Sequence, residues 1–187
     1  ISINNLSNLN NCLVDKLEST NSKISIDFPY FINKNAPETN SKGIVDYGIN
    51  LVSTLENGSS ELISTVSVPV TTLCPCSKAI SDRGAHNQRG CVKFSIVASS
   101  FIWLEDMISL VESTASSELY SVLKRPDEKL VTERAYDNPV FVEDLVRNVA
   151  IKANQLDPIT WYKIEAENFE SIHNHNAYAV VIKNRKS

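Results

Sequence analysis

The residues with the clearest chemical potential lie in one short polar run, TTLCPCSKAISDRGAHNQRG, which spans residues 71–90. The run holds Cys74, Cys76 and His86, from a chain that has only four cysteines and three histidines. A thiolate and a neutral imidazole are ligand types that suit zinc. The spacing between Cys74 and His86 matches no standard zinc-finger pattern, and a buried thiol beside a surface histidine is the competing interpretation. Cys76 is the less persuasive ligand candidate of the two cysteines.

Two further segments supply carboxylates. KRPDEK at 124–129 places Asp127 and Glu128 in what reads as a polar loop, where one carboxylate could complete a coordination shell or simply be solvated. Glu143 is expected on a helix, at the margin of an apolar stripe, where a carboxylate would be partly desolvated and would need a partner. Arg147, four residues later, would make an ordinary surface ion pair with Glu143 as the alternative.

The remaining histidines lie in NFESIHNHN, which contains Glu170, His173 and His175. A glutamate and a histidine three residues apart can share a water or a metal ion, and histidine is the side-chain type that exchanges protons near neutral pH. A solvated hairpin tip is the alternative. All three histidines therefore lie in polar stretches with acids or thiols nearby, which indicates an active site.

The elements that must position these residues follow from hydrophobic periodicity and turn signals. Asn57-Gly58 is typical of a hairpin turn, and Asn138 before Pro139 is typical of a helix start. Pro29 is expected near the end of an edge strand. The mostly antiparallel order predicts an α+β fold. We expect a helix at 5–19, strands at 23–31, 45–55, 62–68 and 91–97, a helix at 103–119, an irregular connection at 120–137, a helix after 138, and a closing hairpin at 161–183.

Composition narrows the class of protein. The chain has 187 residues, 42% of them apolar, which is enough for one ordinary domain or two small similar halves. Its net charge is −4 and its lysines and arginines are scattered, which argues against nucleic acid as a partner. Its apolar runs are too short to span a bilayer, and few cysteines without a secretory signal favour the cytoplasm.

Three motifs, TTLCPCSKAISDRGAHNQRG, LKRPDEKLVTERAYDNPVFVEDLVR and EAENFESIHNH, together resemble the type IB GTP cyclohydrolase family over residues 23–182. The resemblance implies the tunnelling fold, with antiparallel sheets, helices packed on one face and two tandem modules per subunit. Family members have a longer N-terminal segment, so we expect residues 1–70 to be the remaining part of the first module and 71–187 to be the second. It also implies a barrel-like homotetramer.

The same resemblance implies the chemistry. The family converts GTP and water to 7,8-dihydroneopterin triphosphate and formate, the first step toward folates, pterins or a queuosine precursor. One divalent metal per site, zinc with manganese or iron as alternatives, would be held by Cys74, His86 and Glu128. Glu143 would grip the guanine edge, and Glu170 and His173 would join Cys74 as catalytic residues. Candidate cations for the triphosphate are Lys78, Arg83, Arg89 and Lys124.

Two other functions remain compatible with these residues. A structural metal module would close four protein ligands, for instance Cys74, Cys76, His86 and one more, around the ion. A different tunnelling-fold enzyme, acting on a pteridine or deazapurine, would use a cysteine nucleophile free of metal. The histidine of GAHNQR and the glutamate of RPDEK favour the GTP cyclohydrolase interpretation.

Overall fold

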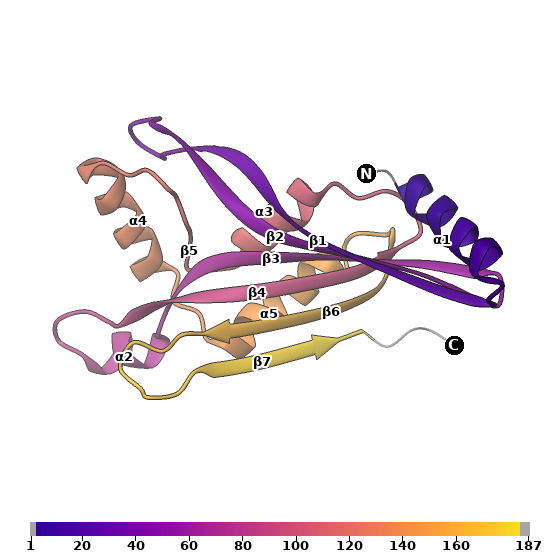
Figure 1. Cartoon of the computed structure of the whole chain (residues 1–187). Coiled ribbons are helices and arrows are strands. Elements are labelled where there is room, and N and C mark those ends of the chain that lie inside the picture. Colours follow the sequence, from indigo (N-terminus) through magenta and orange to yellow (C-terminus); the bar gives the residue numbers. More distant parts are fainter. Residues whose placement is uncertain (1–2, 184–187) are drawn as a thin grey trace.

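A long antiparallel sheet organises the protein, and a computed structural model describes residues 3–183 of it. The strand order is β1-β2-β3-β4-β6-β7, and the short β5 pairs with β3 (Figure 1). Every pairing is antiparallel, as expected for an α+β protein. The strands are β1 Asn21–Asn35, β2 Lys42–Glu56, β3 Ser59–Leu73, β4 Asn87–Ala98, β5 Ser117–Glu118, β6 Ile159–Asn168 and β7 Ala177–Ile182.

The predicted hairpin between β2 and β3 is confirmed. Glu56 pairs with Ser59 across a two-residue turn in which Asn57 and Gly58 have φ angles of 47° and 82°. Positive φ at both turn residues matches the right-handed twist of the flanking strands, and asparagine and glycine tolerate it best. Pro29 does lie in an edge strand, but β1 continues to Asn35, so the expectation that Pro29 marks its end is wrong.

The helices α1 Ile3–Leu17, α3 Leu104–Glu112 and α5 Val142–Ala153 pack on one face of this sheet (Figure 1). Alternate residues of the strands point at these helices, and Val66, Val92 and Ile164 are fully buried beneath them. At the far end, Asn10 of α1 donates from Nδ2 to Ser53 Oγ at 2.7 Å. No helix between residues 3 and 183 combines the length and apolar character needed to cross a membrane.

Three sequence predictions around these helices are wrong. The helix expected at 103–119 ends at Glu112. The connection expected to be irregular contains α4, Arg125–Asp137. Asn138 closes α4 as its C-cap, and α5 begins only at Val142. The helix α4 escaped prediction because it has no apolar stripe: its only buried residues are Asp127 and Ala135.

The helix α4 begins beside the turn that joins β1 to β2. Asp127 Oδ1 accepts hydrogen bonds from the backbone N–H groups of Glu38 and Thr39, both at 2.9 Å. Its Oδ2 accepts from Thr39 Oγ1 at 2.7 Å and from the backbone N–H of Lys124 at 2.9 Å. Burial alone would raise the pKa of Asp127, but these hydrogen bonds outweigh it and hold the pKa well below its usual range. The start of α4 is therefore fixed to the 36–41 turn.

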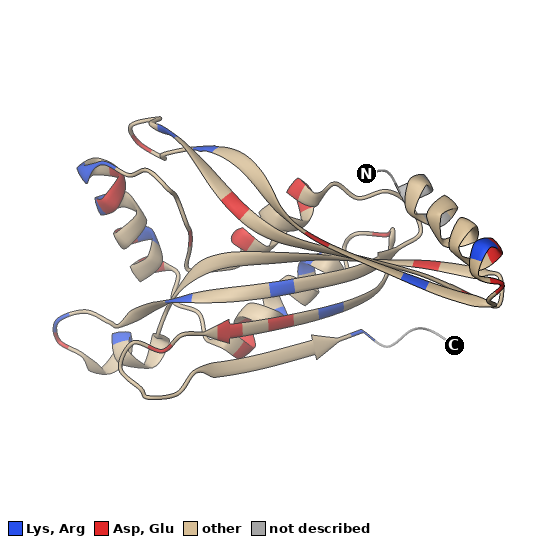
Figure 2. Cartoon of the chain, viewed as in Figure 1, with Lys and Arg blue, Asp and Glu red and all other residues tan. Residues whose placement is uncertain are grey.

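A second set of contacts, which we call the charged network, holds the last turn of α4. Lys34 Nζ binds Glu112 Oε1 at 2.7 Å and also pairs with Glu118. Glu118 Oε1 accepts from Tyr120 at 2.6 Å and pairs with Arg134 of α4 at 3.2 Å. Elsewhere, acidic and basic side chains are interspersed along strands and helices, with no single-sign stripe in this view (Figure 2).

The predicted division into two modules falls within one sheet. Residues 70 and 71, on either side of the expected boundary, both belong to β3, which pairs with β2, β4 and β5. An antiparallel sheet with helices on one face agrees with the predicted architecture. The tandem modules stay a prediction.

Candidate active site

Cys74 and His86 lie side by side at one end of the sheet. The β3–β4 ladder ends with Leu73 opposite Asn87, and the next hydrogen bond runs from the Cys74 N–H to the His86 carbonyl at 3.1 Å. Ser77 ties the two segments together: its Oγ donates to the Cys74 carbonyl and accepts from the His86 N–H, both at 3.2 Å. Two potential ligands twelve residues apart in sequence are thus held together by the sheet.

The Cys74 thiol is half-buried and is not in a disulfide. Cys74 is the N-cap of the short helix α2, Pro75–Ile80, and its Sγ accepts the backbone N–H of Ser77 at 3.4 Å. Cys76 follows in the first turn and is exposed. The extended segment therefore turns into a helix between the two cysteines, which places their side chains in different surroundings.

The His86 ring is oriented through its Nδ1 atom. Nδ1 lies 3.0 Å from Gln88 Oε1, and Gln88 in turn donates from Nε2 to Thr72 Oγ1 at 2.8 Å. Ser171 Oγ lies 3.5 Å from the same Nδ1. When Nδ1–H donates to Gln88, the lone pair of the neutral ring is on Nε2, which is the form a metal ion requires.

The connection between β6 and β7 brings the other histidines to this end. The rings of His86 and His173 are 6.4 Å apart between centroids and nearly perpendicular, and His175 stacks on His173 at 5.2 Å. Both His173 and His175 are exposed, and Glu170 is half-buried in the same connection. The structure thus gathers the three histidines, although they are up to 89 residues apart. The catalytic roles of Glu170 and His173 stay predictions.

The helix α5 starts near the same end, because the Val140 N–H donates to the carbonyl of Leu73 at 3.1 Å. Glu143 lies in the first turn of α5 and is exposed, so the expectation of partial desolvation is wrong for the single chain. Arg147 pairs with Asp144 at 2.6 Å rather than with Glu143. The carboxylate of Glu143 is accessible to a ligand.

Glu128 is placed differently from the other predicted ligands. Its side chain is 53% exposed and lies 3.5 Å from Arg125 at the start of α4, whereas Lys78 of α2 contacts the carbonyl of Tyr136 near the end of α4. Eight residues separate Glu128 from Tyr136, which is about 12 Å along a helix. Within residues 3–183, no three His, Cys, Asp or Glu side chains are grouped so that they could hold a metal ion.

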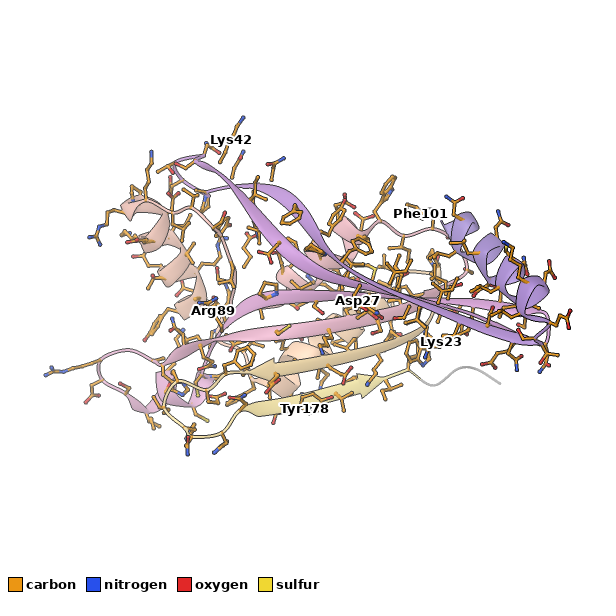
Figure 3. The ribbon with its side chains drawn as sticks, viewed as in Figure 1. Lys23, Asp27, Lys42, Arg89, Phe101 and Tyr178 are labelled. Atoms are coloured by element: carbon orange, nitrogen blue, oxygen red, sulfur yellow. The ribbon has the colours of Figure 1, made fainter. Side chains whose placement is uncertain are left out.

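The predicted triphosphate cations are dispersed. Arg89 is exposed at the start of β4, two residues beyond Asn87 (Figure 3). Arg83 is exposed in the loop between α2 and β4. Lys78 lies over the Tyr136 ring at 4.3 Å, and Lys124 is the N-cap of α4. Arg83 and Arg89 are each three residues from His86, so distance in sequence does not rank these two candidates.

Two cavities border these elements. One of about 460 Å³ is lined by Gln88, Arg89, Cys91, Phe169 and Ser171, among others, next to His86. Burial raises the pKa of the Cys91 thiol on its wall. Another, of about 830 Å³, lies between the ends of α3 and α4 and the outer side of α5. The smaller cavity is lined by Gln88 and Ser171, which both contact His86.

Sequence reasoning missed the residues that hold His86 in place. Thr72, Ser77 and Gln88 carry no charge, and nothing in their spacing marks them as functional. Gln88 does interrupt the apolar face of β4, where Val92, Phe94 and Ile96 are buried, and this break in the pattern was the available signal.

The Cys74 and His86 pair fits a zinc-type ion in its donor chemistry. The residues that carry the sulfur and the imidazole are joined by a backbone hydrogen bond, and when Nδ1–H donates to Gln88, Nε2 is left as the donor atom. A third ligand from elsewhere is needed to complete three protein donors.

Comparison with known proteins identifies the family. The family model described as type I GTP cyclohydrolase folE2 matches residues 1–179. A GTP cyclohydrolase FolE2 from Akkermansia muciniphila is 56% identical over 178 residues, covering 94% of this chain and 67% of that protein. One from Magnetococcus marinus is 49% identical over 187 residues, covering 100% of this chain and 71% of that protein. The chain thus spans roughly two thirds of the length of these relatives.

A solved structure supports the fold independently. The crystal structure of uricase from Arthrobacter globiformis superimposes with a TM-score of 0.54 at 9% sequence identity, covering 97% of this chain and 69% of that one. This likeness agrees with a tunnelling-like α+β architecture. The family model and the sequence matches lead to one conclusion: the chain belongs to the type I GTP cyclohydrolase FolE2 family.

Proposed function

We propose that the chain is a metal-dependent GTP cyclohydrolase that converts GTP and water to 7,8-dihydroneopterin triphosphate and formate. The observation that carries the proposal is the Cys74–His86 pair at the end of the β3–β4 ladder, joined by a 3.1 Å backbone hydrogen bond in a member of this family. The substrate follows from the names of the relatives. A single divalent ion, zinc or alternatively manganese or iron, is the proposed cofactor.

The first role of the chain is to hold the ion. Cys74 Sγ and His86 Nε2 are two of the proposed ligands, and Glu128 is the third. When bound, such an ion polarises water and lowers its pKa toward neutrality, which supplies a nucleophile for hydrolysis at C8 of the purine.

The second role is to orient the base. The carboxylate of Glu143 faces outward from the first turn of α5. A carboxylate can accept hydrogen bonds from both N1–H and the exocyclic amine of guanine, and such charge-assisted pairs are about twice as strong as neutral ones. We assign the guanine edge to Glu143.

The third role is proton transfer. When the bonds from C8 to N7 and N9 break, each nitrogen leaves as an amine and must gain a proton. His173, whose ring lies 6.4 Å from that of His86, is the proposed donor. Glu170, three residues earlier on the same connection, is proposed to return the proton to His173.

Glu128 raises a specific question about assembly. Asp127 fixes the start of α4 through four hydrogen bonds, and the charged network fixes its last turn. For Glu128 to reach Cys74 in its own chain, α4 would have to leave these contacts. We therefore propose that the homotetramer brings Glu128 of one copy to Cys74 and His86 of another.

Mixed oligomers test this arrangement. Cys74→Ala and Glu128→Ala chains are each expected to be inactive alone. If they are unfolded and refolded together, about one quarter of the sites should contain both intact ligands when these come from different copies. Recovery of activity supports a shared site, and no recovery from a folded mixed oligomer places both ligands in one chain.

The activity itself is tested directly. The assembled chain, loaded in turn with zinc, manganese or iron, is incubated with GTP, and formate is measured together with the fluorescence of the oxidised pterin. We expect both products in a fixed ratio. If no metal gives either product in a folded oligomer, the proposed activity of this chain is wrong. The four cysteines are unpaired in the structure, which agrees with a reducing compartment, and we propose the cytoplasm.

A further inference from the structure

The side chain of Gln88 connects the His86 ring to the buried end of the sheet. Its Oε1 lies 3.0 Å from His86 Nδ1, and its Nε2 donates to Thr72 Oγ1 at 2.8 Å. Gln88 is 8% exposed and Thr72 is fully buried. Gln88 therefore has both ends of its amide occupied in a place where water has little access.

The sheet fixes the position of this connection. Thr72 and Gln88 are direct partners in the β3–β4 ladder, so their backbones hold the two side chains opposite each other. His86, two residues before Gln88, extends from the same face of the chain. Ser171 Oγ also approaches Nδ1, at 3.5 Å, but it is exposed and at the limit of hydrogen-bond distance.

The direction of the hydrogen bonds decides which ring nitrogen is free. With Gln88 Nε2 donating to Thr72, its Oε1 faces His86 and accepts Nδ1–H. A neutral imidazole carries one proton, so Nε2 then keeps its lone pair. A reversed amide would donate to Nδ1 and leave the proton on Nε2, where it would block metal binding.

We propose that Gln88, anchored by Thr72, is a positioning residue that fixes the tautomer and orientation of His86, so that Nε2 is presented to the metal ion. The inference rests on the proposed function, because it takes His86 as a ligand. Partners of this kind, which hydrogen-bond to the distal nitrogen of a ligating histidine, commonly change metal affinity about 10- to 100-fold when removed.

The tautomer is the most direct test. Long-range 15N–1H correlation spectra of the metal-free protein distinguish Nδ1–H from Nε2–H, and His86→Ala identifies the signals among only three histidines. We expect Nδ1–H for His86 in the wild type and in Gln88→Glu, whose carboxylate still accepts, and a shift toward Nε2–H in Gln88→Leu. Nε2–H in the wild type would overturn the proposal.

Metal affinity is the second test, measured by competition with a chromophoric zinc chelator. Gln88→Leu should bind zinc about 10- to 100-fold more weakly, and Gln88→Glu should restore the affinity. Thr72→Val, which removes only the anchor, should have a smaller effect in the same direction. The matched control is Thr65→Val, since Thr65 makes a similar 2.8 Å contact to Ser95 in the same β3–β4 ladder but away from His86.

The outcomes separate this inference from the proposed function. If the wild type does not bind zinc, or binds it equally well after His86→Ala, the proposed metal site is wrong. If the wild type binds zinc through His86 but folded Gln88→Leu binds it as tightly, Gln88 has no positioning role. If Gln88→Leu does not fold, Thr72→Val and the wild-type tautomer still decide the question.

Discussion

Two clusters of polar side chains use their hydrogen-bonding groups in opposite ways. In the charged network, Glu112 Oε1 accepts from both Lys34 and Tyr47 at 2.7 Å, and the side chains of Lys34 and Glu112 are only 13% and 12% exposed. Around Cys74 and His86, the hydrogen bonds shown are ones that orient the groups, and His173 and His175 are exposed. The side chains of the first cluster are paired with one another, whereas the second leaves His173 and His175 exposed and Cys74 and His86 half-buried.

The pKa shifts follow the same division. Burial, followed by the hydrogen bond to Glu112, raises the pKa of Tyr47 far above its usual value. Burial and the hydrogen bond to Glu118 raise the pKa of Tyr120 to about 12. These tyrosines remain protonated donors over the whole physiological range. A strongly perturbed ionisable group can therefore mark a structural network rather than an active site.

Removal of the Cys74 thiol should have the largest effect on activity. Cys74→Ala should lower turnover of GTP by at least about 10³-fold, because loss of a metal ligand removes several kcal/mol of transition-state stabilisation. Thermal unfolding should change little. Cys12→Ala, on the exposed side of α1, is the control and should retain full activity. An active Cys74→Ala enzyme would show that the Cys74 thiol is not needed for GTP turnover.

A smaller loss is expected at the proposed guanine contact. Glu143→Gln should raise the KM for GTP about 10- to 100-fold, the size of a lost charge-assisted hydrogen bond, while zinc stays bound. Asp144→Asn is the matched control, since Asp144 is the residue after Glu143 in α5 and pairs with Arg147. Equal effects of the two substitutions on KM would show that general surface charge, not Glu143, captures GTP.

Substitutions in the charged network should lower the free energy of unfolding rather than the activity. Lys34→Met leaves Glu112 and Glu118 without their shared cation, and breaking a largely buried pair in this way costs about 3 kcal/mol of unfolding free energy. Lys129→Met removes the exposed pair with Glu133, at 2.9 Å, and should cost less than about 0.5 kcal/mol. Urea unfolding of both variants measures the difference, and similar values would show that the network is not a structural unit.

The sequence predicted the strands better than the helices for a physical reason. Alternation along β2, β3 and β4, together with Asn57-Gly58, specifies strands and a turn from local information. The helix α4 is specified mainly by tertiary contacts: Asp127 binds the 36–41 turn, and Arg134 pairs with Glu118. Because α4 has no apolar stripe, hydrophobic periodicity does not predict it. The residues alone marked Asp127 and Glu128 as carboxylates of a polar loop, and the resemblance to a family singled out Glu128.

The candidate site shows the same limit. The types and clustering of Cys74, His86 and His173 indicated a common site, and the structure does place them at one end of the sheet. Gln88 and Thr72 could not be recognised, because their role depends on strand register rather than on residue type. The exposure of Glu143 and the separation of Glu128 from Cys74 depend on how whole helices are placed.

The smallest expected effect is the pH dependence of the stability that Glu118 contributes. Burial would raise the pKa of Glu118, but the hydrogen bonds from Lys34 and Tyr120 and the charge of Arg134 lower it below its usual value. Because the folded-state pKa lies below the unfolded-state value, Glu118 contributes its full stabilisation above the unfolded-state pKa and loses it as the pH falls through the folded-state pKa. In urea titrations, the stability gap between the wild type and Glu118→Gln should therefore narrow as the pH is lowered from 7 toward acid. The effect should be smaller than that of Lys34→Met, since a single ionisation is involved. A gap that stayed constant with pH would mean that Glu118 acts through packing rather than charge, and the charged network would then differ less from the Cys74 and His86 end than its contacts imply.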